Sequence, residues 1–145
     1  MFFKIIEFES TEYEQMVDLR SKILRTPLGL TFTEKQLEAE KDDILLGSFD
    51  EKDNRIKACC ILSKVDDSTI KLRQMAVSEE FQGKGIGRKL IAYAEKVAKE
   101  KGFRKIIMNA RKSVDGFYEK LGYKVVGDEF IEVSIPHCKM EKNIN

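Results

Sequence analysis

A glycine-rich turn separates an apolar stretch from a helix-like stretch in the middle of the chain. The turn, QGKGIG at 82–87, has glycine at alternate positions; 69–77 has a strand-like composition, and 85–101 repeats apolar residues at helical spacing. Glycine adopts backbone conformations that other residues avoid and lets a ligand approach the main chain. At a helix N-terminus the free amide groups and the helix dipole attract anions. The segment therefore predicts an α/β fold with a site for a phosphate-bearing ligand.

Three other interpretations of the turn compete with a pyrophosphate site. A P-loop needs a Ser or Thr hydroxyl after Gly-Lys, and this helix continues with Arg88, Lys89 and Leu90. A dinucleotide-binding turn follows the first strand as GxGxxG, which is not the spacing at 82–87. The third interpretation is a glycine-rich helix start that binds nothing. Because the turn directly joins a predicted strand to a predicted helix, an anion site is favoured over a helix start that binds nothing.

The rest of the chain alternates between strand-like and helix-like stretches. Short polar links join the three stretches within 44–77, which predicts an antiparallel meander. We expect strands at 2–8, 44–49, 56–65, 69–77 and 105–110, and a final strand pair in 123–142 broken near Asp128 and around Pro136. We expect helices from Thr11 to about Ile23, after Thr33, at 85–101 and at 113–121. The predicted fold is a mixed α/β (α+β) fold on one sheet, in the order β-α-α-β-β-β-α-β-α-β-β.

Local signals mark the ends of the helices. Thr11, followed three residues later by Glu14, fits a capping box at the start of the first helix. Pro27 and Gly29 are expected to end that helix. Gly102 has the position of a C-terminal glycine cap for the long helix. These signals predict the bounds of each element independently of the fold.

Size and charge narrow the function classes. The chain has 145 residues and no low-complexity linker, so we expect one domain over 1–145. Its formal net charge of +1 argues against a general nucleic-acid coat. No apolar run approaches the roughly 20 residues of a membrane span, and the opening MFFKIIEFES lacks the features of a signal peptide. We expect neither nucleic acid nor a membrane as partner.

Cysteine and histidine usage indicates the compartment. The three cysteines are Cys59, Cys60 and Cys138, and neighbours on a strand face opposite sides of the sheet. We therefore expect three reduced thiols buried as small side chains in a cytoplasmic protein. With one histidine and no CxxC, a zinc site is not expected, and we predict no metal.

Charge is unevenly distributed along the chain. Residues 82–112 carry ten Lys or Arg and two Glu, a net charge of +8. Residues 1–54 carry seven basic and thirteen acidic residues, a net charge of −6. The basic segment suits a phosphate-rich cofactor, and the acidic segment suits a cationic amine. The alternative is that both are solvated surfaces.

Two segments together resemble the GNAT N-acetyltransferase superfamily. Residues 82–87 after the strand 74–77 resemble its motif A, and NARKSVDGFYEKLGY at 109–123 resembles its motif B. The opening at 20–30 and the ending IPHxxM at 135–140 resemble a small bacterial branch, so the resemblance covers nearly the whole chain. It implies the family's fold, in which a central pair of parallel strands splays apart.

The resemblance implies an N-acetyltransferase that moves the acetyl group of acetyl-CoA, its acyl-donor cosubstrate, to a primary amine by direct attack. The Val77 amide would donate to the thioester carbonyl as negative charge develops. A small-molecule or peptide amine is the expected acceptor, and a homodimer is a common assembly among relatives. The implied cofactor-binding residues are Met75, Ala76, Val77, Gln82, Gly83, Lys84, Gly85, Ile86, Gly87, Arg88, Asn109 and Tyr118.

Tyr118 and Asn109 carry the implied catalytic roles in motif B. Tyr118 matches the family's tyrosine, which donates a proton or a hydrogen bond to the CoA thiolate; the alternative is packing beside Phe117. Asn109 would hydrogen-bond the pantetheine arm or face the substrate. A catalytically silent acyl-CoA sensor or partner module with the same cleft remains the alternative to an enzyme.

The group that accepts the amine's proton is left open. His137 is the only histidine, and its alternative role is to hold a loop. Glu132 is a second candidate base or an anchor for the amine, and Glu79 is a third. Water can also relay the proton. Arg20 and Arg25 are expected on the surface; binding a carboxylate or closing the site through ion pairs is the alternative.

Overall fold

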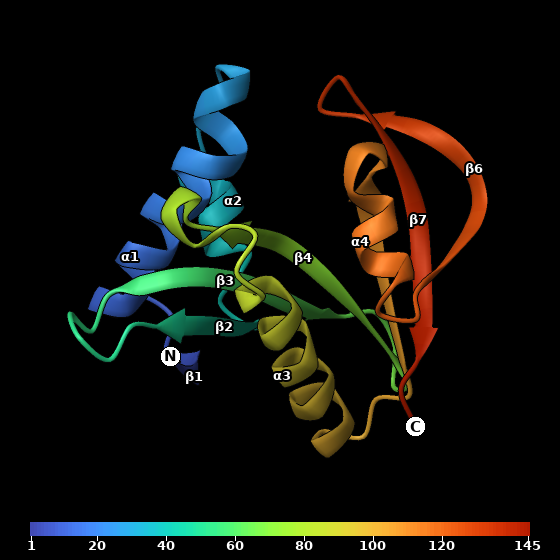
Figure 1. The fold of residues 1–145 in the computed structure, drawn as a ribbon, viewed down its shortest axis with the longest axis horizontal. Coiled ribbons are helices and arrows are strands. Elements are labelled where there is room, and N and C mark those ends of the chain that lie inside the picture. Colours follow the sequence, from blue (N-terminus) through green and yellow to red (C-terminus); the bar gives the residue numbers. More distant parts are fainter.

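The computed structural model describes residues 1–145 and contains one seven-stranded sheet flanked by helices (Figure 1). The strands are β1 (Phe2–Ile6), β2 (Ile44–Phe49), β3 (Ile56–Lys64), β4 (Thr69–Val77), β5 (Lys105–Arg111), β6 (Lys124–Glu132) and β7 (Ile135–Asn143). The helices are α1 (Thr11–Arg20), α2 (Glu34–Glu38), α3 (Ile86–Glu100) and α4 (Asp115–Glu119), with short π or 3₁₀ segments at Ser21–Arg25, Thr26–Leu28, Glu79–Phe81 and Lys112–Val114. The element order and the mixed α/β class are those predicted.

The sheet divides into two parts that meet at β4 and β5. The strand order is β1-β2-β3-β4-β5-β7-β6, and every pair is antiparallel except β4 with β5. In that parallel pair only residues 69–71 of β4 are paired with residues 105–107 of β5, and beyond them the two strands separate (Figure 1). A bulge in the β3–β4 pairing lies where Gln74 has a φ of +54°, and bulges bend the strand that carries them. The implied splay is thus present, and it leaves the facing edges of both strands without a partner strand.

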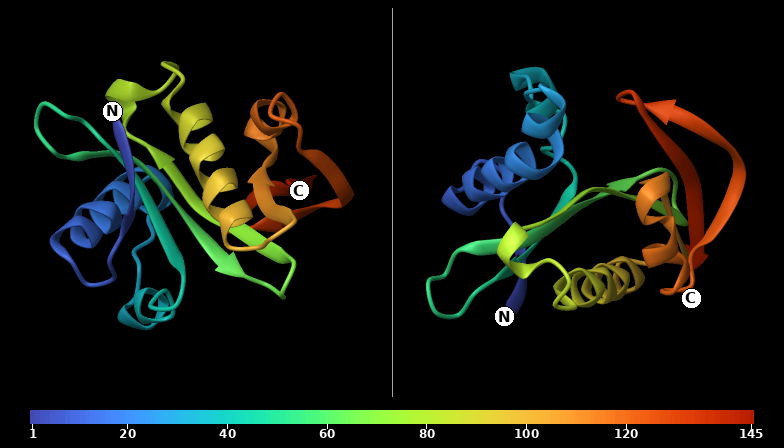
Figure 2. Two further views of the ribbon diagram at one scale, coloured as in Figure 1. Left: turned by 90° about the horizontal axis from the view of Figure 1, so that it is seen from below. Right: turned by 45° about the horizontal axis from the view of Figure 1, so that its top comes forward.

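A hydrophobic core lies on each face of the sheet (Figure 2). The larger core packs α3, α4 and the inner side chains of β4, β5 and β7 together, with Leu90, Ile106 and Met140 fully buried. The smaller core packs α1 against the opposite face of β2 and β3, around Met16 and Phe49. The larger core contains Ile70 and Ile106, which face each other at the paired end of β4 and β5, so this core holds the two strands together there.

The ends of several elements differ from the sequence prediction. Ser10, and not Thr11, caps α1, since its hydroxyl accepts the Tyr13 amide at 3.1 Å. The final strand pair turns at Val133 and Ser134, two residues before the break expected around Pro136, and Pro136 itself lies near the start of β7, paired with Ile131.

Two local predictions, the irregularity near Asp128 and the glycine cap at Gly102, are confirmed. The predicted break near Asp128 is a bulge between Val126 and Phe130 within β6. Gly102 has a φ of +92° immediately after α3, as a C-terminal glycine cap requires. No helix combines the length and the apolar character needed to cross a bilayer. No three His, Cys, Asp or Glu side chains are grouped to hold a metal ion.

Candidate active site

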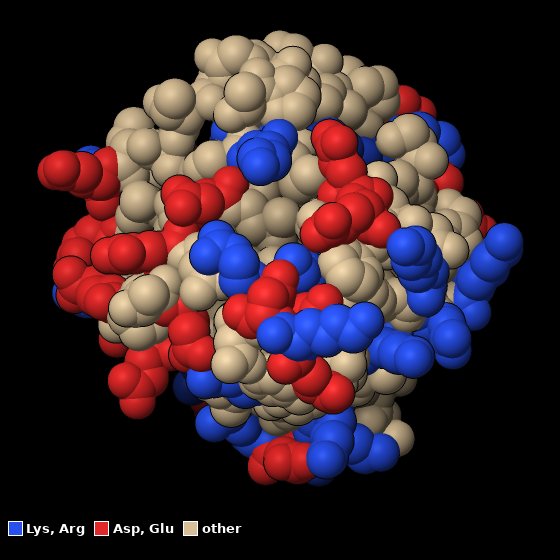
Figure 3. All heavy atoms as spheres, turned by 60° about the vertical axis from the view of Figure 1, so that its left-hand side comes forward, with Lys and Arg blue, Asp and Glu red and all other residues tan.

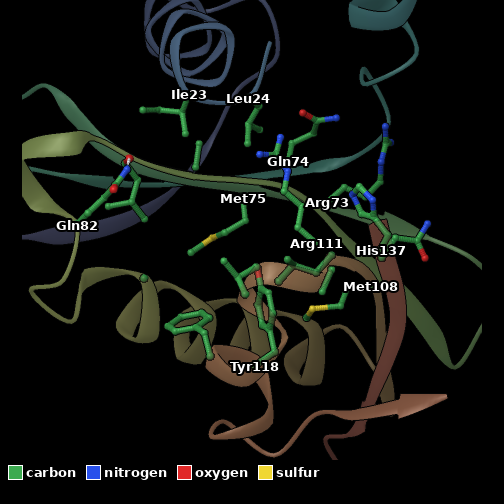
Figure 4. Close-up of a pocket in the computed structure, with 18 of the residues that line it drawn as sticks. Ile23, Leu24, Arg73, Gln74, Met75, Gln82, Met108, Arg111, Tyr118 and His137 are labelled. Carbon is green, nitrogen blue, oxygen red and sulfur yellow. Dashed lines mark hydrogen bonds between the residues drawn. The ribbon is translucent and has the colours of Figure 1, made fainter. Parts of the chain in front are cut away.

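A cavity of about 850 Å³ lies where β4 and β5 separate (Figure 4). The segment after α1, the glycine turn, α4 and the β6–β7 turn complete its wall. Gln82 lies at one end in Figure 4, Arg111 and His137 lie at the other, and Met75 and Tyr118 lie between them. The predicted site residues that line the cavity are Met75, Ala76, Val77, Gln82, Gly83, Gly85, Gly87, Arg88, Asn109, Tyr118, Glu132 and His137.

The glycine turn shapes one end of the cavity through its backbone. Gly83 and Gly85 have φ values of +75° and +84°, and Gly85 is the N-cap of α3. A Cβ on Gly87 would lie 3.4 Å from the Met75 Cε atom and 3.5 Å from the Phe117 ring. The turn therefore presents main chain, free of side-chain bulk, at the start of a 15-residue helix.

Two predicted cofactor residues of the turn do not line the cavity. The Ile86 side chain belongs to the core under α3 and is 7% exposed. The Lys84 ammonium lies 5.5 Å from the centre of the Phe81 ring, on the surface. Only their backbone is part of the turn.

Val77 presents its peptide groups to the cavity. The Ser78 amide donates to the Lys57 carbonyl at 2.7 Å, so the amide of the preceding residue on the strand points to the opposite edge, where β5 has moved away. The Gln82 side-chain amide donates to the Val77 carbonyl at 3.0 Å (Figure 4). Gln82 thus holds the turn against the end of β4.

Tyr118 brings a phenol from α4 to the middle of the cavity. The side chain is 7% exposed and packs edge-on against Phe117 and Tyr123, with ring centres 5.0 and 6.0 Å away. Its hydroxyl has no hydrogen-bond partner within the protein, whereas the Tyr123 hydroxyl donates to Glu95 at 2.9 Å. Burial raises the pKa of Tyr118, with a smaller contribution from Cys60. The phenol is therefore protonated at neutral pH and free to donate.

Glu132, His137 and Asn109 meet at the other end of the cavity, from three strands. The Glu132 carboxylate lies 3.6 Å from His137 Nε2 and 3.5 Å from the Asn109 side-chain amide nitrogen. His137 is 4% exposed, and its Nδ1 lies 2.7 Å from the Ile135 carbonyl, so Nδ1 carries the hydrogen. Nε2 is then the nitrogen that faces Glu132.

The third candidate base lies outside the cavity. Glu79 is exposed in the 3₁₀ turn after β4 and does not line the cavity. Glu79 is therefore not placed to accept a proton inside the cavity.

The two N-terminal arginines have different surroundings. Arg20 is fully buried, and its guanidinium donates to both Glu40 oxygens at 2.8 and 2.6 Å. The expectation of a surface side chain is therefore wrong for Arg20, because Glu40 buries with it as a paired charge. Arg25 lies half-buried in the cavity wall, 4.7 Å from the centre of the Phe32 ring.

The sequence analysis missed two arginines of the cavity wall. Arg73 on β4 and Arg111 on β5 line the end that contains Glu132. Their neighbours Leu72 and Ala110 belong to the core under α3, so strict alternation places the two arginines on the opposite face. The alternation can be predicted from the sequence. The separation of β4 from β5, which opens the cavity between the strands that carry these arginines, cannot.

The three cysteines are buried thiols away from this chemistry. Cys59 and Cys60 belong to the cores on opposite faces of the sheet, as predicted, and Cys138 is buried on β7. Burial raises the pKa of all three thiols, to about 12 for Cys59. None lines the cavity.

The charge asymmetry of the sequence is also present on the surface. Figure 3 shows acidic side chains toward one edge of the face turned forward and basic side chains toward the opposite edge. The cavity itself differs from both, since Glu132 is the only carboxylate among its lining residues and several arginines accompany it.

Comparison with known proteins places the chain among acetyltransferases. A family model described as an acetyltransferase (GNAT) domain matches residues 31–144. The uncharacterised protein YyaT of Bacillus subtilis is 31% identical over 83 residues, which are 57% of this chain and 56% of YyaT. The uncharacterised N-acetyltransferase YitI of the same organism is 27% identical over 132 residues, 87% of each chain.

The solved structures show the same fold. An aminoglycoside 6′-N-acetyltransferase complexed with coenzyme A superposes with a TM-score of 0.82 at 18% identity, over 100% of this chain and 98% of that one. The aligned part spans about half the length of YyaT and of two further curated relatives. The family model nevertheless matches most of the chain, and the fold agrees, so this protein belongs to the GNAT acetyltransferase family.

Proposed function

We propose that this chain transfers the acetyl group of acetyl-CoA to a primary amine, with residues 1–145 acting as one domain. One observation carries the proposal. The buried side chain of Tyr118 lines the cavity between the separated ends of β4 and β5, and its hydroxyl is protonated and has no partner within the protein. A proton donor at that place suits a leaving thiolate, which gains stability from a hydrogen bond or a proton as it departs.

The residues present fit a CoA thioester. Gly83 and Gly85 open the backbone at the N-terminus of α3, and Arg88 adds positive charge there, which suits a pyrophosphate. The unpaired edges of β4 and β5 offer peptide groups to an amide-containing pantetheine arm. In this arrangement the Val77 amide donates to the thioester carbonyl, whose oxygen gains negative charge during attack.

The transfer requires stabilisation of the leaving thiolate and loss of a proton from the amine. The amine nitrogen attacks the thioester carbonyl carbon, the C–S bond breaks, and the departing thiolate accepts a hydrogen bond from the Tyr118 hydroxyl, which keeps its proton because burial holds the pKa of the phenol above that of a thiol. The attacking nitrogen loses a proton toward the pair formed by Glu132 and His137, directly or through water. The short contact between Nδ1 and the Ile135 carbonyl supports this assignment, because it leaves Nε2 without a hydrogen in the neutral ring. Asn109 holds the Glu132 carboxylate from the side of β5.

A thermal melt with acetyl-CoA tests the donor site first. At a hundredfold excess over Kd, binding stabilises a protein by about 2.7 kcal/mol. For a chain of this size that raises the melting midpoint by roughly 5–15 °C. We expect this shift with acetyl-CoA and none with ATP or NAD. A shift with ATP instead would overturn the proposal.

Thiol release from acetyl-CoA then separates an enzyme from a silent sensor. We expect release that depends on an added primary amine and is absent without it. Acetyl-CoA binding without release across a broad amine panel would favour a sensor or partner module.

A further inference from the structure

The end of the cavity that contains Glu132 carries more positive charge than the protein neutralises. Arg25, Lys71, Arg73 and Arg111 line the cavity, from the segment after α1, from β4 and from β5. Glu132 is the one carboxylate in the lining. Three separate segments therefore bring cations to one place that holds a single fixed anion.

Two of these arginines have no carboxylate partner. Arg25 and Arg111 form no ion pair within 4.0 Å, and the Arg25 Nε atom is buried without a hydrogen-bond partner. Arg73 lies 3.7 Å from Asp43 and donates to the Ser63 hydroxyl at 3.2 Å, so its charge is partly balanced. The guanidinium groups of Arg25 and Arg111 thus keep donors available toward the cavity.

Arg20 differs from Arg25 because its charge is fully paired inside the protein. It precedes Arg25 by five residues in the sequence, and its guanidinium group donates to both oxygens of Glu40. Phe32 lies under both guanidinium groups, at 4.6 Å from Arg20 and 4.7 Å from Arg25. Burial and the nearby Arg20, Arg111 and Arg73 charges lower the pKa of Arg25, and the Glu132 carboxylate only partly opposes them. An anion in the cavity would relieve that crowding.

The phosphates of CoA do not account for these cations. The glycine turn that suits a pyrophosphate is at the Gln82 end of the cavity, and Figure 4 shows Arg73 and Arg111 beside His137 at the other end. Leu72 and Ala110, which flank them, face the core under α3 instead. The arginines therefore face the side on which the attacking amine must enter.

We propose that the acceptor is an amine that also carries an anionic group, a carboxylate or a phosphate, bound by Arg25 and Arg111. Guanidinium groups hold either anion through paired, charge-assisted hydrogen bonds. The amino group of the same molecule lies toward Glu132 and His137. This inference rests on the proposed function, and it disfavours polycationic acceptors such as aminoglycosides.

Matched pairs of amines test the charge preference. We would measure acetyl-CoA thiol release with 4-aminobutyrate against butylamine and with O-phosphoethanolamine against ethanolamine, and also with kanamycin. Rates are compared at equal concentrations of unprotonated amine. We expect at least tenfold higher kcat/KM for the anionic member of one pair, and which pair shows it identifies carboxylate or phosphate. Equal rates within both pairs, or a preference for kanamycin, would overturn the proposal.

Substitutions locate the preference. Arg111→Gln should reduce it to less than threefold, mainly by raising KM for the anionic amine, and leave acetyl-CoA affinity unchanged. Arg25→Gln is the second variant if the first does not fold. Arg55→Gln, in the exposed link between β2 and β3, is the matched control and should keep the full preference. Retained preference in both cavity variants would assign the anion to other residues.

A binding measurement separates this inference from the proposed function. Melts of the protein with each amine, both without and with CoA, report anion recognition without turnover, and we expect a larger shift from the anionic member in each series. An acetyl-CoA shift without any charge preference refutes the anionic acceptor alone. Charge preference without an acetyl-CoA shift refutes the proposed donor and leaves the anion site standing.

Discussion

The two ends of the cavity differ in whether main chain or side chains line them. The end at the glycine turn consists of main chain from one continuous segment, 82–88, where glycines keep side chains away. The opposite end consists of side chains from five separate segments, namely Arg25, Arg73, Arg111, Glu132 and His137. Under the proposed function, backbone donors at the helix start would bind the part common to CoA thioesters, and the side chains at the other end would bind the acceptor. The two kinds of recognition would then be separable, since they depend on different parts of the chain.

Gly85→Asp should have the largest effect, because it places a side chain and a negative charge in the turn. We expect loss of the acetyl-CoA melting shift and at least a hundredfold loss of rate. A residue other than glycine at positive φ also costs about 1–2 kcal/mol of stability. Gly102→Asp is the matched control at the other end of α3, with a φ of +92° and open space around it. It should lose similar stability and keep acetyl-CoA binding; loss of binding in both would mean the turn acts only through stability.

Tyr118→Phe should lower kcat by about ten- to a hundredfold and leave acetyl-CoA affinity nearly unchanged. The effect is moderate, since a thiolate is already a fair leaving group. Tyr123→Phe is the matched control, because that hydroxyl bonds Glu95 outside the cavity. It should reduce stability by about 1 kcal/mol without changing kcat. An unaltered rate in Tyr118→Phe would reduce that residue to packing.

The Tyr118 phenol should also change how thermal stability falls at alkaline pH. Burial raises the folded-state pKa of Tyr118 above its ordinary value near 10. Its contribution to the free energy of unfolding is therefore complete below pH 10 and is lost as pH rises through the folded-state value. Melts between pH 8 and 11 should show a smaller alkaline loss for Tyr118→Phe than for the unchanged protein. Identical pH profiles would place the phenol in contact with water.

Glu132→Gln should have a smaller effect, about tenfold on kcat/KM, because water can still carry the proton. We expect a flatter profile of rate against pH and an unchanged melting shift with acetyl-CoA. His137→Gln should act in the same direction if the two groups work as a pair. A lower melting midpoint with a normal pH profile would assign His137 to holding the β6–β7 hairpin through Ile135.

Arg88→Gln should have the smallest effect, a two- to fivefold rise in the Kd of acetyl-CoA. The side chain is exposed, so solvent screens its charge, and the main chain supplies the other donors. A loss above twentyfold would show that the donor end depends on side chains as well, and the contrast between the two ends would no longer hold.

The part of the molecule around the glycine turn could be predicted from residues that are close in the sequence. The order of strands and helices, the glycine caps and the turn at 82–87 all depend on residues that are close in the chain, where periodicity and glycine chemistry act directly. The β6–β7 turn lies two residues before the break expected around Pro136, because a proline near the start of a strand and a proline in a turn look alike in sequence.

The opposite end of the cavity depends on contacts between segments that are far apart in the sequence. Nothing in the sequence indicated that Glu40 buries and neutralises Arg20 while Arg25 stays without a partner, since the two residues look equivalent along the chain. The separation of β4 from β5 turned Arg73 and Arg111 into parts of a cavity wall. Charges from distant segments interact only after the chain has folded, and which of them are paired is decided by packing.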